Sequence, residues 1–138
     1  MNSPAIFGEF LRRPFPDALA AALRARFGDR FTTTAAVREH HGRDESVYPA
    51  TPPDAVVYAH STEEVAEIVR LCREHRFPVI PYGVGSSLEG HLLAIHGGVS
   101  IDLSRMDRVL AIQAEDLTAT VQAGVTRTRL NDELKSTG

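Results

Sequence analysis

The sequence has no tryptophan and only one cysteine, Cys72, in 138 residues. A single cysteine excludes an internal disulfide framework and a multi-cysteine metal site within one chain. No run of apolar residues approaches the 18 that suggest a membrane-spanning helix, so the sequence predicts no transmembrane segment. The net charge of −3 lacks the basic excess typical of proteins that bind nucleic acid. With 43% hydrophobic and 24% charged residues, the composition is that of an ordinary globular domain.

An export signal is also missing from the N-terminal region. Glu9, Asp17 and Asp29 interrupt it, and no continuous apolar core precedes a small-residue cleavage site. We therefore expect a cytoplasmic protein, with a transit peptide as the alternative because the stretch is rich in arginine and partly amphipathic.

Residues 1–43 are predicted to form a helical N-terminal lead-in. Asp17 is predicted to be an N-cap and Gly28 a helix stop, and Leu19, Leu23 and Phe27 recur every four residues between them. A second short helix is expected over Ala35–His41. The polar run from Gly42 to Asp54 contains glycine, aspartate and proline, and we interpret it as a connector.

The next segment has the pattern of a strand, a helix and a second strand. Ala55–His60 is a short β-rich run, and Ser61–Glu64 is a capping box that marks the start of a helix. Helical spacing places four apolar residues on one face, namely Val65, Ile68, Val69 and Cys72. Val79–Tyr82 is the second apolar run. A connection of this length predicts parallel strands with a right-handed crossover.

The remaining chain predicts a long loop followed by antiparallel structure. Gly83–Gly98 holds five of the ten glycines, and a structureless connection of this length is usually functional or disordered. Val99–Leu103 alternates like a half-buried strand. Val109–Ala114 and Leu117–Ala123 are expected to pair as a hairpin, and Thr126 to cap a helix that runs to about residue 136.

The glycine-rich loop carries the clearest chemical signal. Its sequence, Pro81–His91, reads PYGVGSSLEGH. Gly83 and Gly85 allow positive φ and close approach of a ligand, and successive main-chain N–H groups in such a turn form an anion nest. The loop lacks the lysine of a Walker A motif, and Leu88 replaces the third glycine of a Rossmann fingerprint. The residues alone leave two interpretations open, a phosphate-binding loop and a purely structural one.

Three sequence segments together resemble those of a known protein family. PPDAVVYAHSTEEVAEIVRLCREHRFPVIPYGVGSSLEGH, GGVSIDLSRMDRVL and VQAGVTRTRLNDEL occur in the order and spacing of the FAD-linked oxidases of the vanillyl-alcohol oxidase and p-cresol methylhydroxylase type. Within this family, the chain most resembles cytochrome-linked D-lactate dehydrogenases and glycolate oxidase subunits. The resemblance implies an α+β fold in which a small parallel βαβ sheet with flanking helices precedes the first antiparallel strands of a second subdomain. Residues 44–138 would be the N-terminal part of this FAD-binding domain.

The resemblance also implies a cofactor site. In the family, the loop contacts the FAD pyrophosphate mainly through main-chain amides, which assigns cofactor contacts to Tyr82, Gly83, Val84, Gly85, Ser86, Ser87 and Leu88. Ser86 occupies the position at which some relatives carry the histidine that bonds flavin covalently, so the implied FAD is non-covalent. Gln122 and Ala123 stand before Gly124 where relatives usually have Glu-Pro, which is a departure near the cofactor.

The implied reaction is oxidation of a small D-2-hydroxy acid, D-lactate or glycolate, by hydride transfer to FAD. Electrons would then pass to a cytochrome, quinone or other carrier. The family's catalytic residues have no match here, so we expect the chain to be an N-terminal fragment, inactive by itself, whose uncovered apolar face favours self-association. The alternative is a stand-alone nucleotide- or phosphate-binding module without catalysis.

Other reactive side chains have simpler interpretations. His91 follows the loop, and we expect a structural or solvent role for it. Cys72 lies on an apolar helix face and predicts an inert core thiol. His40 and His41 are adjacent in a helix and cannot both face one metal ion, so no metal site is predicted.

Overall fold

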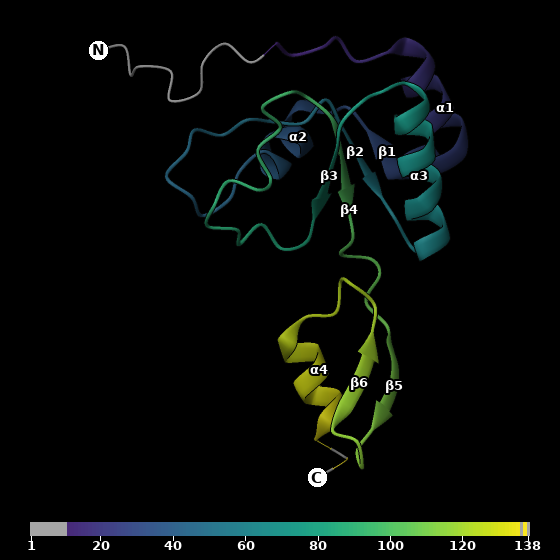
Figure 1. The fold of residues 1–138 in the computed structure, drawn as a ribbon, viewed down its shortest axis with the longest axis vertical. Coiled ribbons are helices and arrows are strands. Elements are labelled where there is room, and N and C mark those ends of the chain that lie inside the picture. Colours follow the sequence, from purple (N-terminus) through teal and green to yellow (C-terminus); the bar gives the residue numbers. More distant parts are fainter. Residues whose placement is uncertain (1–10, 136, 138) are drawn as a thin grey trace.

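The computed structural model of the chain describes residues 11–135 and residue 137. Figure 1 shows an upper sheet with helices around it and a lower hairpin with one helix. The upper part contains, in chain order, α1 (Asp17–Phe27), the 3-10 turn η1 (Gly28–Arg30), β1 (Phe31–Thr32), α2 (Ala35–His41), β2 (Ala55–Tyr58), α3 (Thr62–Glu74), β3 (Val79–Tyr82) and β4 (Val99–Asp102). The lower part contains β5 (Val109–Gln113), β6 (Thr118–Val121) and α4 (Arg127–Leu134). This mixed arrangement confirms the predicted α+β fold.

Four strands form the upper sheet in the order β1-β2-β4-β3. The strands β2, β4 and β3 are parallel, whereas β1 pairs antiparallel with β2. The predicted parallel βαβ unit is confirmed, but its two strands are not neighbours, because β4 lies between them and pairs with both. Tyr58 and Tyr82 are both register partners of Asp102. Three side chains from distant parts of the sequence therefore meet at the carboxyl end of the sheet.

One face of the sheet carries the main hydrophobic core. Side chains from α1 and α3 pack there against alternate residues of the strands. The buried members are Leu19, Leu23, Phe27, Phe31, Ala55, Val57, Ala59, Ile68, Cys72, Phe77, Val99, Ile101 and Met106. Residues 17–32 thus belong to the same core as the sheet.

The other face of the sheet is covered as well. Helix α2 contacts β2 on this side, where Ser100 and Asp102 of β4 are buried. All four residues of β4 are buried, so the predicted half-buried alternation over Val99–Leu103 is wrong. A central strand of a parallel sheet with both faces covered has no solvent side for its polar residues.

The local helix signals agree with the structure in most positions. The Ser61 hydroxyl accepts the N–H of Glu64 at 3.2 Å, which confirms the capping box, and α1 stops at Gly28 with φ of 57°. The N-cap of α1 is Pro16, one residue before the predicted Asp17. Val69 is 40% exposed, so the predicted buried face of α3 is wrong at this position. The buried stripe of α3 is narrower than the sequence suggests and follows Ile68 and Cys72.

The lower part is an antiparallel hairpin packed against a helix. The pairing of β5 with β6 confirms the predicted hairpin, with a register shift between Val109 and Ala111. Both strands are shorter than predicted, and Leu117, the first residue predicted for the second strand, lies in the turn with φ of 53°. The Thr126 hydroxyl accepts the N–H of Arg129 at 3.2 Å, which confirms the cap of α4. That helix ends at Leu134, and the predicted end at residue 136 lies outside the described residues.

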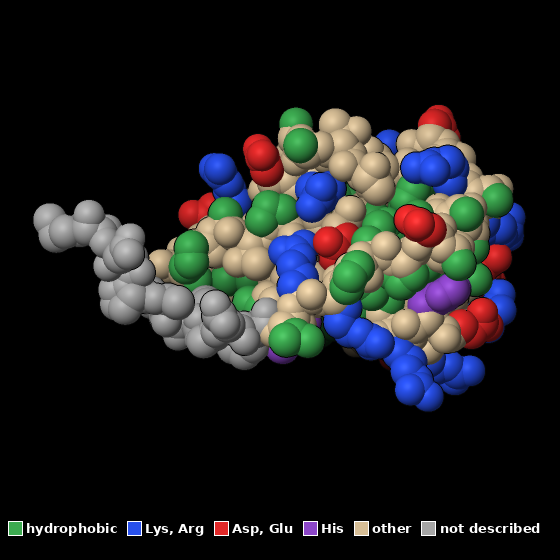
Figure 2. Space-filling view, turned by 90° about the horizontal axis from the view of Figure 1, so that it is seen from above, with side chains coloured by type: hydrophobic (Ala, Val, Ile, Leu, Met, Phe, Trp, Pro, Cys, Tyr) green, Lys and Arg blue, Asp and Glu red, His purple; other side chains and the backbone are tan. Residues whose placement is uncertain are grey.

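Charged side chains of both signs are mixed on the surface. Figure 2, which views the molecule from above, shows basic, acidic and hydrophobic side chains interspersed on this face. Some pairs link separate elements, such as Arg26 of α1 with Glu67 of α3 at 2.8 Å. Among the described helices, none combines the length and apolar character needed to cross a bilayer.

Candidate functional site

The glycine-rich loop starts where the parallel strands end. Strand β3 stops at Tyr82, and the loop leaves the carboxyl edge of the sheet from Gly83 onward. Ligands of open α/β sheets bind outside this edge, because the loops there diverge and leave a crevice. The position of the loop therefore suits a binding site.

The conformation of the loop leaves its donors free. Gly85 has φ of 75°, a region that residues with a Cβ rarely adopt. The main-chain N–H groups of residues 83–87 donate no hydrogen bond to any other described residue. Val84 and Leu88 are 72% and 69% exposed, so the loop is not folded into the core. Unpaired amides in an exposed glycine turn are the donors that an anion nest requires.

Two contacts hold the far end of the loop. The carbonyl oxygen of Ser87 accepts the N–H of Glu45 at 3.0 Å. The Ser87 hydroxyl lies 2.7 Å from Nδ1 of His91. His91 thus contacts the loop itself, in agreement with the structural role expected for it. The loop is fixed at Tyr82 and at Ser87, and its amides lie between these anchors.

A cavity of about 380 Å³ lies beside the loop. Gly83 and Val84 form one wall, and the N-terminus of α4 with Thr126 and Arg127 forms another. The remaining lining residues are Ser104, Ala123, Gly124 and Val125. Among the described residues that line it, Arg127 is the one charged side chain, and it has no ion pair with another described residue. An arginine, free amides and a helix N-terminus together suit a phosphate or diphosphate group.

The sequence did not predict the second wall of this cavity. Thr126 was recognised as a helix cap, and the same feature signals that free N–H groups of a helix start there. Nothing in the local sequence shows that this helix end comes to the loop at Gly83, more than 40 positions earlier. After β5, strand β6 runs back toward the sheet, as Figure 1 shows, and the segment that follows it brings the start of α4 to the loop.

Gly124 fits tightly into the backbone at this wall. Its N–H donates to the carbonyl of Met106 at 2.8 Å, and a Cβ at this position would overlap the carbonyl oxygen of Leu103. The preceding Gln122 accepts the N–H of Arg108 at 3.0 Å through its side-chain oxygen. The departure at Gln122 and Ala123 therefore leaves the turn supported, because the glutamine supplies its own hydrogen bond.

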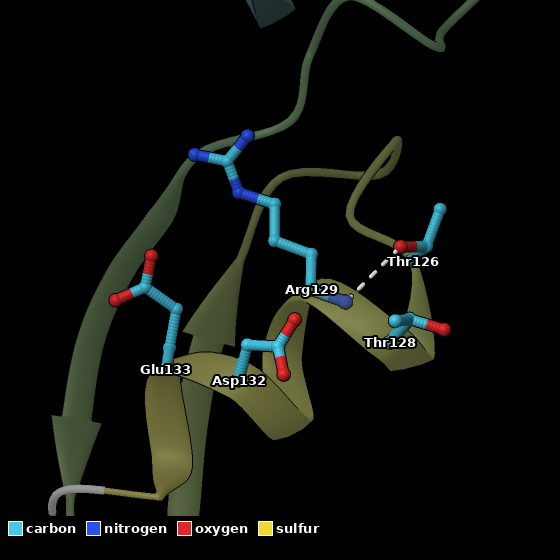
Figure 3. Close-up of a pocket in the computed structure, with 5 residues that line it drawn as sticks. All are labelled: Thr126, Thr128, Arg129, Asp132 and Glu133. Atoms are coloured by element: carbon cyan, nitrogen blue, oxygen red, sulfur yellow. Dashed lines mark hydrogen bonds between the residues drawn. The ribbon is translucent and has the colours of Figure 1, made fainter.

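A larger hollow on α4 is a poorer candidate. It has a volume of about 550 Å³ and is lined by Thr126, Thr128, Arg129, Asp132 and Glu133, drawn in Figure 3. The Arg129 guanidinium already binds Asp107 at 2.6 Å, and Asp132 binds Lys135 at 2.6 Å. Two carboxylates in the wall repel an anion, and the basic group is neutralised by its own partner. The cavity beside the loop is the better site.

The predicted contact residues are not all at the cavity. Gly83 and Val84 line it, whereas Tyr82 and Gly85 lie against each other and are absent from its lining. Ser87 anchors the loop, and Leu88 points to solvent. Direct contact of all seven residues, 82–88, with a cofactor stays a prediction.

Comparison with known protein families identifies the family of this chain. Residues 53–138 match the family described as FAD binding domain. The chain belongs to this family. FAD is therefore the cofactor of the domain, and the resemblance inferred from the sequence is confirmed.

The curated relatives are longer than this chain. The chain is 43% identical over 123 residues to the probable mitochondrial D-lactate dehydrogenase of Danio rerio, covering 88% of this chain and 25% of the relative. Identity is 38% over 133 residues with the mitochondrial D-lactate dehydrogenase (cytochrome) of Arabidopsis thaliana, covering 95% and 23%. It is 42% over 89 residues with glycolate oxidase subunit GlcD of Bacillus subtilis, covering 61% and 19%. The chain spans about a quarter of the length of the D-lactate dehydrogenases that it matches.

Solved structures confirm the fold. Alkyldihydroxyacetonephosphate synthase superposes with a TM-score of 0.79 at 29% identity, over 93% of this chain and 28% of that chain. p-Cresol methylhydroxylase with substrate bound also gives a TM-score of 0.79, at 22% identity, over 92% and 26%. The expected fold of the p-cresol methylhydroxylase type is thus confirmed.

Proposed function

We propose that the chain holds the diphosphate of FAD in a flavin-dependent oxidoreductase that oxidises a small D-2-hydroxy acid. The main support for this proposal is the 380 Å³ cavity, where the free amides of the glycine loop face Arg127 and the start of α4. D-Lactate and glycolate are the leading substrates, because relatives are named D-lactate dehydrogenase and glycolate oxidase subunit.

FAD, when bound, supplies the acceptor for the hydride from the α-carbon of the substrate. The residues of this chain bind and orient it. The amides of Gly83 and Val84 donate to diphosphate oxygens, and Arg127 balances their charge from the opposite wall. Ser86 stands where a linking histidine occurs in some relatives, and a serine hydroxyl makes no such bond, so the FAD is held non-covalently.

The reduced enzyme passes its electrons to a cytochrome, quinone or other carrier. The name of the Arabidopsis relative supports a cytochrome as the electron acceptor.

The predicted cytoplasmic location contrasts with the mitochondrial names of two relatives, and fractionation of cells that express the gene tests it. Leu110 and Val121, on the hairpin, are 56% and 37% exposed and support the expected self-association, which light scattering measures.

FAD binding to the chain by itself is expected to be weak. Charge-assisted hydrogen bonds contribute roughly 1.5–3 kcal/mol each. Loss of translational and rotational freedom on association costs about 4 kcal/mol or more. A few such bonds leave a dissociation constant on the order of millimolar. The purified chain is therefore expected to be colourless, and yellow flavin retained through gel filtration would contradict this estimate.

An NMR titration tests the site directly. FAD and ADP added to the isotope-labelled chain should shift the amide signals of residues 83–87 and 126–127, and AMP, which lacks the diphosphate, should shift them less. Absence of shifts at these residues in excess FAD would refute the site.

The activity is tested on the full-length protein. Addition of D-lactate or glycolate should bleach its flavin absorbance and reduce an acceptor dye. A full-length protein that carries no flavin while the chain still binds ADP would support the alternative, a nucleotide-binding module without catalysis.

A further inference from the structure

A buried histidine–carboxylate pair lies next to the glycine loop. His41 is the last residue of α2, and Asp102 is the last residue of β4. The His41 Nε2 atom is 2.7 Å from Asp102 Oδ2, and the two side chains are only 3% and 6% exposed. The other ring nitrogen, Nδ1, is 2.8 Å from the carbonyl oxygen of Val37. Neither of these groups has a part in the cofactor contacts described above.

Both partners of His41 offer acceptor oxygens. A carbonyl oxygen and a carboxylate oxygen face its two ring nitrogens, an arrangement in which an imidazolium donates to both. Burial raises the pKa of Asp102, but hydrogen bonds from His41 and Ser104 outweigh it and hold that pKa below its ordinary value. The carboxylate therefore offers its oxygens as acceptors to His41 and to the Ser104 N–H.

The pair contacts the loop through Tyr82. The rings of His41 and Tyr82 have centroids 4.2 Å apart, and the Tyr82 hydroxyl is 3.3 Å from Nε2 of His40. A Cβ built on Gly85 would lie 2.8 Å from the Tyr82 hydroxyl, so this hydroxyl touches the loop backbone. The ring of Tyr82 thus fills the space between the ion pair and the glycine turn.

Two further residues complete the surroundings of His41. The Tyr58 ring meets His41 edge-on at 6.0 Å, and the Arg105 guanidinium stacks 4.4 Å from the centre of the Tyr58 ring. Burial raises the pKa of Tyr82, and the nearby charge of Asp102 adds to this, so Tyr82 stays a neutral hydroxyl. The ring of His41 is thus bonded at both nitrogens and packed on its other sides.

We propose that His41, held as an imidazolium by Asp102 and Val37, is a positioning residue that fixes Tyr82 beneath the loop and so orders the loop for FAD. This proposal depends on the proposed function in one respect only, the identity of FAD as the ligand of the loop. A ring that is hydrogen-bonded at both nitrogens cannot rotate, and a turn rich in glycine has little stiffness of its own. The buried pair supplies that stiffness from outside the loop.

Three substitutions separate charge, ring and loop contact. Asp102→Asn lets the amide donate to a neutral His41 and still accept from Ser104, so the ring position is kept without the charge. His41→Gln removes the ring. Tyr82→Leu breaks the link on the loop side and leaves the ion pair. His60→Gln, at an exposed histidine, is the matched control.

The first measurement is the long-range 1H–15N spectrum of the imidazole at pH 7. We expect two protonated nitrogens for His41 in the unsubstituted chain and one in Asp102→Asn. A bare ring nitrogen in the unsubstituted chain would overturn the proposal.

The second measurement is the heteronuclear NOE of residues 83–87 without FAD. His41→Gln and Tyr82→Leu should lower it, and should weaken FAD binding about tenfold, whereas Asp102→Asn and His60→Gln should retain both. If His41→Gln fails to fold, the loop NOE of Tyr82→Leu decides whether the contact orders the loop. Loop NOE values equal to those of His60→Gln in every folded variant would refute the positioning role. Since these NOE values are recorded without FAD, failure of the unsubstituted chain to bind FAD would refute the proposed function and not this one.

Discussion

The guanidinium of Arg30 binds the carboxylate of Glu64 through two hydrogen bonds, of 2.6 and 2.8 Å. Glu64 also accepts the main-chain N–H of His60 at 2.8 Å. This bidentate contact joins the turn after α1 to the first turn of α3. The hydrogen bond from Arg30 is the main reason that the pKa of Glu64 is lowered to about 2, against a smaller opposing effect of burial.

The first prediction concerns stability in acid. A depressed carboxyl pKa contributes stability that is present above the unfolded value, about 4.3, and is lost as the pH falls toward 2. We expect Glu64→Gln to reduce the free energy of unfolding at pH 7 by about 2 kcal/mol. The difference from the unsubstituted chain should shrink below pH 4, as denaturant titrations at several pH values would show.

The matched control for this prediction is Glu67→Gln. Its partner Arg26 is 59% exposed, and exposed ion pairs contribute less than about 1 kcal/mol. An equal loss of stability in both variants would contradict the special role of the Arg30–Glu64 pair.

The second prediction separates the two glycines of the loop. Gly85→Ala should weaken FAD binding and lower stability by roughly 1–2 kcal/mol, because φ of 75° is strained for alanine and its methyl group meets Tyr82. Gly83 has no atom within 4 Å of a built Cβ. We expect Gly83→Ala to keep the melting temperature and to weaken FAD binding alone, because the methyl group is added at the cavity wall. Calorimetry and NMR titration measure the two effects, and identical behaviour of both variants would contradict the assignment.

The third prediction concerns the charge in the cavity. Arg127→Gln should weaken FAD binding by about fivefold, roughly 1 kcal/mol, and should reduce its dependence on salt. Arg129→Gln is the control, because Arg129 is neutralised by Asp107 and lines the other hollow. A larger loss of affinity for Arg129→Gln would move the anion site to that hollow.

The fourth prediction concerns Cys72. Burial raises the pKa of its thiol to about 12, so almost no thiolate is present near neutral pH. A thiol reagent should modify the native chain at least about a hundredfold more slowly than the chain in denaturant. Rapid labelling under native conditions would show that α3 separates from the sheet.

Much of the fold was predictable because its signals are local. The stop at Gly28, the cap at Ser61 and the strand at Val79–Tyr82 each depend on a few neighbouring residues. The exposure of Val69 was not predictable in this way, because helical spacing defines a face and not which part of it meets α1.

The candidate site was only half predictable. The glycines of the loop indicate its backbone freedom, and the family resemblance indicates its ligand. Arg127 and Ser104 could not be assigned to it, because their sequence neighbours carry no sign of the loop that they meet.

The sequence by itself determined most helix starts and stops and marked the glycine-rich loop as a candidate for binding an anion, because capping and glycine conformation are properties of a few consecutive residues. Only the tertiary structure decided that β4 lies between β2 and β3, that His41 meets Asp102, and that α4 closes the cavity. These contacts join residues far apart in the chain, and they form only when the strands and helices pack together, so no local pattern in the sequence indicates them.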